Sequence, residues 1–146
     1  MGSFTVRELA AQDYPAVRAL WEESAGMLMR EADTPKAIAA FLCRNPGLSF
    51  VALDGDLLIG VLLCGQDGRR AYLHHVAVAS SHRRLGIATV LVEHCSAALL
   101  DQGIRKCHLC VVNENLAAHR FWAHLGWGER KDVRLMSRIL AGSDNA

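Results

Sequence analysis

The pattern of hydrophobic and polar residues divides the chain into short segments of two kinds. Segments of the first kind carry apolar residues in alternation or in short runs between turn residues, as strands do: residues 4–9, 48–53, 57–64, 71–78 and 105–112. Segments of the second kind repeat apolar residues three or four positions apart, as helices do: residues 14–25, the stretch from 35 to the Asn-Pro-Gly at 45–47, 86–100 and 115–126. Residues 127–140 predict one or two final strands.

Residues that begin and end helices support this division. Asp13 and Thr34 stand where helices are expected to begin, each with a proline in the first turn that follows, and Gly103 and Gly126 stand where later helices end. The Asp-Gly-Asp at 54–56 predicts a tight turn between two strands. The order β, α, α, three strands, then α, β, α and one or two strands predicts an α+β domain with a mixed sheet and a βαβ unit in its second half.

Composition limits the class of protein. The chain has 146 residues, of which 51% are hydrophobic, so we expect a single domain over residues 1–140 and a disordered tail at 141–146. The formal net charge of +1 argues against a partner nucleic acid, which normally selects a strong basic excess. We also expect no membrane span, because no apolar run is long enough, and a cytoplasmic location, because the N-terminus lacks the pattern of a signal peptide.

The five cysteines lie mostly within apolar segments, which suits a reducing compartment. Cys107 and Cys110 form a Cys-x-x-Cys, which can hold a metal or act as a redox pair. The surrounding pattern predicts a strand, in which these two side chains point to opposite faces. We therefore expect no metal and no redox role here.

The candidate chemistry lies at "SSHRRLGIATVL", residues 80–91, where a predicted strand leads through a short loop into a helix. Arg83 and Arg84 stand directly before the helix, and Gly86 allows a ligand to approach the backbone closely. The free N–H groups and the partial positive charge of a helix N-terminus favour a bound phosphate. A solvated loop that merely begins a helix explains the hexamer "RRLGIA", residues 83–88, equally well. A P-loop or a Rossmann turn does not explain it, because neither motif is present.

The spacing Arg83-x-x-Gly86-x-Ala88 resembles the acyl-CoA signature [RQ]-x-x-G-x-[GA] of the GNAT N-acetyltransferase superfamily. The context is similar as well, with "HVAVASSH" before the signature and "HLCVV" and "NENLAAHRFWAHLGW" after it. The resemblance runs over nearly the whole chain and is greatest to small single-domain bacterial members of the YpeA-like kind. It implies the GNAT fold, a mostly antiparallel sheet of six to seven strands with four flanking helices, in which the fourth and fifth strands run parallel and splay apart.

The resemblance implies acetyl-CoA as cosubstrate and assigns residues to it. The backbone of the glycine loop would hold the diphosphate, the fourth strand would pair with the pantetheine arm, and Asn115, which also suits a helix cap, would contact the cofactor. The implied cofactor-binding residues are Val76, Ala77, Val78, Arg83, Arg84, Leu85, Gly86, Ile87, Ala88, Thr89, Asn115 and Trp122.

The implied reaction is direct transfer of the acetyl group to an amine, which must first lose a proton to a base. Strand alternation places Tyr72, His74 and Val76 on one face and Leu73, His75 and Ala77 on the other. His74 is the leading candidate for the base, ahead of His75, and Tyr72 shares its face. Glu22, with Glu23, is a further candidate, suited to holding a cationic acceptor, although a solvated helix face explains both glutamates too.

One position departs from the family pattern. Many members carry a tyrosine where Trp122 stands, to protonate the departing thiolate, whereas an indole N–H only donates hydrogen bonds. We expect Trp122 to pack against the cofactor instead. The alternative function is an acyl-CoA-binding module with little or no turnover. The resemblance leaves the amine acceptor open and allows a homodimer.

Overall fold

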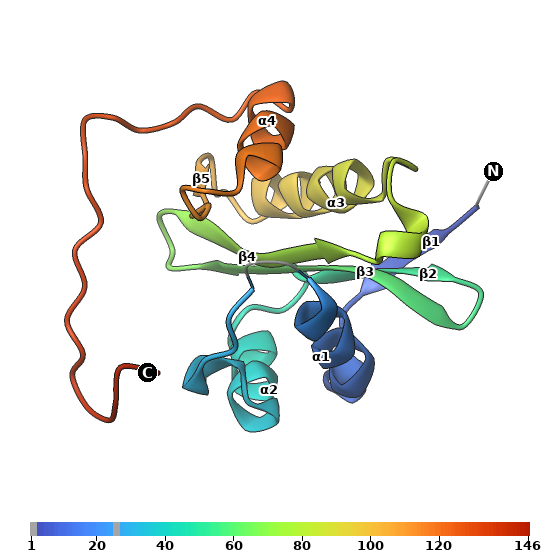
Figure 1. Cartoon of the computed structure of the whole chain (residues 1–146), viewed down its shortest axis with the longest axis horizontal. Helices are drawn as coiled ribbons and strands as arrows, with labels where there is room; N and C mark the ends of the chain where they lie inside the picture. The colour runs from blue at the N-terminus through green and yellow to red at the C-terminus, as the bar shows by residue number, and fades with distance from the viewer. Residues whose placement is uncertain (1–2, 25–26) are drawn as a thin grey trace.

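The computed structural model describes residues 3–24 and 27–146 and shows three layers (Figure 1). A central sheet separates α1 and α2 on one face from α3 and α4 on the other. The elements are β1 Thr5–Glu8, α1 Tyr14–Glu23, α2 Pro35–Arg44, β2 Phe50–Asp54, β3 Leu57–Gln66, β4 Ala71–Val78, α3 Ile87–Asp101, β5 Cys107–His108 and α4 Leu116–His124, with short 3-10 turns η1 Ala11–Asp13, η2 Glu31–Asp33 and η3 Ser80–His82.

The sheet has the order β1-β2-β3-β4-β5. Every neighbouring pair is antiparallel except β4 and β5, which run parallel as expected. Only two residue pairs join these last strands, Ala71 with Cys107 and Tyr72 with His108. The remainder of β4 therefore has no strand beside it on that edge among the described residues.

The helices begin much as the sequence predicts. Pro35 opens α2, and the Thr34 hydroxyl accepts a hydrogen bond of 3.2 Å from the backbone N–H of Ala37. α1 ends at Glu23, before the expected residue 25, which lies outside the described residues. Asp13 does not cap α1 with its side chain; its carboxylate instead forms an ion pair of 2.8 Å with Arg7. None of the helices over 3–24 and 27–146 combines the length and the hydrophobicity of a membrane-crossing segment.

Two apolar clusters hold the layers together. The cluster beneath α3 and α4 contains Leu48, Ala52, Ile59, Leu62, Cys64, Ala71, Leu73, Ile87, Leu91, Val92, Cys95, Leu99, Ile104 and Trp122. The cluster beneath α1 and α2 contains Leu9, Val17, Leu20, Trp21, Ile38, Val51, Val61, Leu63 and Ala77. Each face of the sheet is thus buried against its own pair of helices.

A β-bulge interrupts β4 in its middle and corrects the expected alternation. Val61 pairs with Ala77 and Leu63 pairs with His74. Between these two pairs β4 advances by three residues while β3 advances by two, so β4 contains one extra residue. His75 has a φ of +48°, in the left-handed region. Beyond the bulge the phase is reversed, so Ala77 packs on the α1 side and Val76 packs with Leu73 on the α3 side. The prediction that His75 shares a face with Leu73 was therefore wrong.

The C-terminal part of the chain also differs from expectation. The sheet has five strands rather than six or seven, β5 is only two residues long, and residues 127–140 form no strand. This segment runs extended away from α4 (Figure 1). An apolar pattern gives a strand only where the segment packs on a sheet, and here Leu135, Met136 and Leu140 remain exposed. The tail folds back at its end, where the backbone N–H of Glu31 donates to Asn145 O at 2.9 Å.

Candidate functional site

Two cavities open along the unpaired part of β4. The larger, of about 540 Å³, lies at the β4 C-terminus beside the start of α3. The smaller, of about 260 Å³, lies farther back along β4, between that strand and the segment that follows β5. Both are lined by Val76, Asn115, Ala118 and Trp122, so the two cavities meet at these side chains.

The larger cavity contains nearly all residues that the resemblance assigned to a cofactor. Its lining consists of Val76, Ala77, Val78, His82, Arg83, Arg84, Gly86, Ile87, Ala88, Thr89, Asn115, Ala117, Ala118, Phe121 and Trp122. Leu85 is the one assigned residue that does not line it; its side chain is exposed instead. The residues assigned from the resemblance thus lie together along one wall of this cavity.

The loop before α3 adopts a conformation that only a few residues take easily. Gly86 is the N-cap of α3 with a φ of +78°, and Arg84 has a φ of +63°. A Cβ added at Gly86 would meet no heavy atom within 4 Å, so the space above this backbone is open. The N-terminus of the 15-residue α3 therefore faces the cavity with its N–H groups accessible.

Positive charge gathers around the same opening. The guanidinium Nε of Arg83 donates to Val78 O at 3.2 Å, which holds this side chain over the end of β4. His82 lies beside it and contacts Asp54 through Nε2 at 3.0 Å. Together with the partial positive charge of the helix end, these groups can bind a phosphate or diphosphate.

Asn115 stands where the two cavities meet and caps α4. Its Oδ1 accepts a hydrogen bond of 3.1 Å from the backbone N–H of Ala118, so the helix-cap interpretation holds. No hydrogen bond of its Nδ2 occurs among the described residues. That amide group can therefore serve a ligand while the oxygen serves the helix.

Trp122 is buried where α4 crosses the gap. Its ring lies 5.0 Å from that of Phe121 and 5.2 Å from that of Trp127, both in edge-to-face geometry. Because it lines both cavities, it forms the wall that they share.

His74 and His75 line the smaller cavity together, because His74 faces the helix layer of α1 and α2 by regular alternation and the bulge turns His75 to the same side. His74 makes no side-chain hydrogen bond within the described chain; its ring stacks on Tyr72 at 6.3 Å and meets Phe41 edge-on at 6.1 Å. Partial burial lowers the pKa of His74, and the neighbouring His75 lowers it further. The side chain is partly exposed, so solvent weakens this effect.

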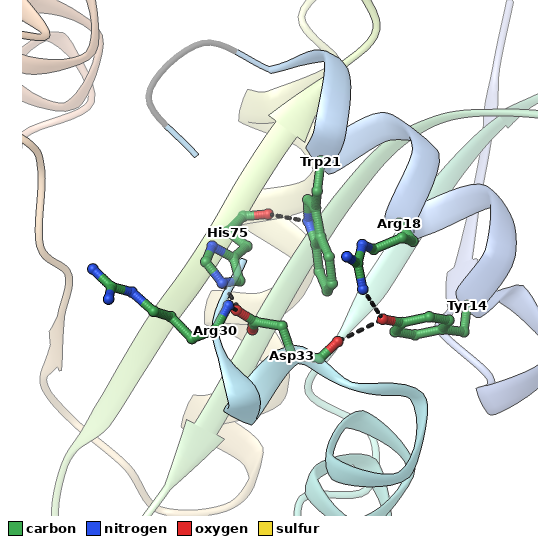
Figure 2. A network of polar contacts seen from close by, with 6 residues as sticks. All are labelled: Tyr14, Arg18, Trp21, Arg30, Asp33 and His75. Atoms are coloured by element: carbon green, nitrogen blue, oxygen red, sulfur yellow. Dashed lines mark hydrogen bonds and ion pairs between the residues drawn. The ribbon is translucent and has the colours of Figure 1, made fainter. Parts of the chain in front are cut away.

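His75 belongs to a polar network that ties three elements together (Figure 2). Its Nε2 lies 2.9 Å from Asp33 Oδ1, and its backbone carbonyl accepts a 3.0 Å hydrogen bond from Trp21 Nε1. On the other side, the Tyr14 hydroxyl donates to Asp33 O at 2.6 Å and accepts from Arg18 at 2.9 Å. The network joins α1 and η2 to the bulge of β4.

The remaining candidate residues lie elsewhere. Tyr72 is exposed next to β5, with its ring 5.3 Å from that of His108. Glu22 lies 3.3 Å from Arg18 on the surface of α1, and Glu23 Oε1 accepts from the Ser80 N–H at 3.4 Å. Neither glutamate lines a cavity.

Cys107 and Cys110 differ in their surroundings. No group of three or more potential ligands comes together within residues 3–24 and 27–146. The neighbouring Cys64 and burial both raise the pKa of the Cys107 thiol, which disfavours the thiolate that metal or redox chemistry requires. Cys110 is exposed and lines the smaller cavity.

No motif in the sequence marks Asp33, Tyr14, which donates to its carbonyl, or Trp21, which donates to the carbonyl of His75. Asp33 is 42 residues from His75 in the chain and occurs in a stretch without a motif. An acidic residue two positions before a proline-initiated helix is ordinarily part of a cap. Only the packing of η2 against β4 shows its other role.

Comparison with known proteins identifies relatives over most of the chain. A model of the acetyltransferase (GNAT) family matches residues 5–127. N-alpha-acetyltransferase 30 of Schizosaccharomyces pombe is 34% identical over 109 residues, 71% of each chain. An acetyltransferase of Pectobacterium atrosepticum is 28% identical over 136 residues, 92% of this chain and 95% of its own.

Solved structures share the fold. The NatC complex bound to Gag peptide and CoA matches with a TM-score of 0.77 and 23% identity, over 90% of this chain and 87% of the matched chain. At this identity the likeness concerns the arrangement of helices and strands alone.

Proposed function

Since the chain belongs to the acetyltransferase (GNAT) family, we propose that it transfers an acetyl group from acetyl-CoA to an amine. One observation carries the proposal. The open helix N-terminus at Gly86 leads into a cavity that joins, at Val76 and Trp122, a second cavity lined by two histidines. A cofactor and an acceptor can thus reach one meeting point from opposite ends of β4.

The residues of the larger cavity fit CoA. The N–H groups from Arg84 to Ala88 suit the diphosphate, because they are free at the start of α3 and no side chain covers Gly86. The unpaired edge of β4 at Val76 and Val78 suits the amide groups of the pantetheine arm, which can hydrogen-bond to it as a further strand would.

The chemistry requires a base at the acceptor end. The amine nitrogen attacks the thioester carbonyl, the new N–C bond replaces the C–S bond, and the amine loses a proton. The departing thiolate has a pKa of about 8.5, so solvent can protonate it after it leaves. His74 and His75 are the two titratable groups of β4 in the smaller cavity, and one of them is suited to take the amine proton.

An amine panel tests the proposal. We expect release of free CoA from acetyl-CoA in the presence of at least one of four acceptors: a tetrapeptide amide with a free N-terminus, a lysine ester, spermidine and an aminoglycoside. The peptide is the first to test, because one relative is an N-alpha-acetyltransferase and one fold neighbour is bound to a peptide. Binding of acetyl-CoA without turnover of any acceptor contradicts the proposal and favours the alternative, an acyl-CoA-binding module.

Trp122 motivates that alternative, because an indole cannot protonate the thiolate. We nevertheless expect Trp122→Phe to keep most of the maximal rate, since packing between Phe121 and Trp127 explains the residue. Any loss should appear as weaker binding of acetyl-CoA. The measurement is kcat for the best acceptor beside the Kd for acetyl-CoA; a hundredfold fall in kcat at unchanged Kd contradicts the packing role.

A further inference from the structure

The buried pair of Asp33 and His75 has geometry that a structural contact does not require. We propose that His75, oriented by Asp33, is the base that takes the proton of the acceptor amine, in place of His74. The inference rests on the proposed function and concerns its acceptor end. Three features support it: the β-bulge at His75, the buried carboxylate of Asp33, and the Nδ1 atom of His75, which makes no hydrogen bond among the described residues.

The carboxylate of Asp33 is nearly inaccessible, with the residue only 5% exposed. Its Oδ2 accepts a 2.9 Å hydrogen bond from the backbone N–H of Arg30, and its Oδ1 lies 2.9 Å from His75 Nε2. A buried carboxylate is costly unless it is paired and hydrogen-bonded. His75 is the one side chain that contacts this carboxylate among the described residues, so the two groups depend on each other.

The bulge exists at the residue that meets Asp33. A regular strand would turn residue 75 to the α3 face, together with Leu73. Instead His75 takes a φ of +48°, which is unfavourable for a residue with a side chain, and Trp21 Nε1 holds its carbonyl at 3.0 Å. Strained backbone of this kind persists where surrounding contacts impose it, and it is concentrated at functional sites.

The pairing selects the tautomer that a base needs. With the proton on Nε2 donated to Asp33, the lone pair of Nδ1 remains available. Nδ1 makes no hydrogen bond within the described chain, the side chain is 24% exposed, and it lines the smaller cavity. After proton transfer, the imidazolium lies 2.9 Å from a carboxylate that stabilises it.

The charged and titratable groups around the ring support this assignment. Asp33 and Arg30 approach from η2, His74 from β4, and Arg18 is held behind the Tyr14 hydroxyl on α1. His74 has no hydrogen-bonding partner among the described residues that would orient its ring, and burial and the neighbouring His75 lower its pKa. The preference for His74 came from the family resemblance, in which its position carries a histidine in some amine acetyltransferases.

The test compares glutamine variants of the two histidines with the fastest acceptor of the amine panel. Gln at position 75 can still donate to Asp33 but cannot accept a proton, so we expect kcat to fall about 10²- to 10⁴-fold at an acetyl-CoA Kd within twofold of wild type. His75→Gln should also lose the acidic limb of the pH–rate profile. His74→Gln should keep that limb. His94→Gln, on α3 outside both cavities, is the matched control and should keep the wild-type rate.

Two further variants separate catalysis from folding. Asp33→Asn should lower kcat about tenfold and move the acidic limb to lower pH, because the imidazolium loses its carboxylate. His75→Gly relaxes the strained backbone and leaves a hole, and added imidazole should restore part of its lost rate, which a purely structural role would not allow. A limb that persists in His75→Gln and vanishes in His74→Gln overturns the inference, as does a His75→Gly variant that imidazole does not rescue.

Histidine NMR gives a readout independent of turnover. The ¹⁵N shifts of His75 in the wild type should show the neutral ring protonated at Nε2 above pH 8, and the opposite tautomer overturns the inference. A wild type that binds acetyl-CoA but acetylates no acceptor refutes the proposed function, and the inference falls with it. Loss of activity in His75→Gln alone cannot be confused with that result.

Discussion

Replacing Gly86 by aspartate is expected to abolish the stabilisation of the protein by acetyl-CoA. Ligand at a hundred times its Kd should raise the free energy of unfolding of the wild type by about 2.7 kcal/mol. In the variant a carboxylate stands in the open space over the α3 N-terminus, where the diphosphate is proposed to bind, and repels it. The measurement is thermal unfolding with and without acetyl-CoA.

Gly103 provides the matched control for this variant. It also has a positive φ, +83°, also lacks a heavy atom within 4 Å of an added Cβ, and follows the opposite end of α3. Gly103→Asp should therefore cost similar backbone strain while keeping the full ligand-induced shift. Equal shifts in wild type and Gly86→Asp would contradict the placement of the cofactor.

Replacing Trp21 by alanine is expected to lower the free energy of unfolding by about 3–5 kcal/mol. The indole is fully buried in the cluster beneath α1 and α2, so its removal leaves a large cavity and an unpaired carbonyl at His75. Trp21→Phe keeps most of the apolar volume but loses the N–H, and it should cost about 1–3 kcal/mol. Urea unfolding measures both.

Trp127→Ala serves as the comparison, because this indole is only partly buried and lies outside both cavities at the β4–β5 gap. We expect it to cost clearly less than Trp21→Ala. If the two alanine variants are equally destabilised, burial of Trp21 does not anchor the α1 layer as described.

Much of the architecture can be predicted from the sequence because local signals agree with the packing. The range of β4 is the predicted one, Ala71–Val78, since turn residues bound an apolar run on both sides. The loop at Gly86 lines the larger cavity, and its glycine takes a positive φ directly before the long apolar helix α3. These features are encoded within a few residues of where they occur.

The bulge at His75 and the pair with Asp33 could not be predicted in the same way. Alternation of apolar and polar residues describes a regular strand and contains no sign of the extra residue. The bulge is held in part by a contact distant in the chain, the hydrogen bond from the indole N–H of Trp21, 54 residues away, to the carbonyl of His75. The strands expected in residues 127–140 are absent for a related reason. The hydrophobic pattern of a segment does not reveal whether that segment pairs with another strand.

The bulge also determines how β4 tolerates a change of length. Because of the extra residue, odd-numbered residues before the bulge and even-numbered residues after it face the same helix layer. Leu73 and Val76, for example, both pack toward α3 although three positions separate them. Loss of the codon for His75 would remove the extra residue and leave a regular strand, in which Ala71, Leu73, Val76 and Val78 still share the α3 face. In a strand without a bulge the same deletion would turn one half of the side chains toward the wrong layer, whereas here it would straighten the backbone and remove the histidine of the bulge.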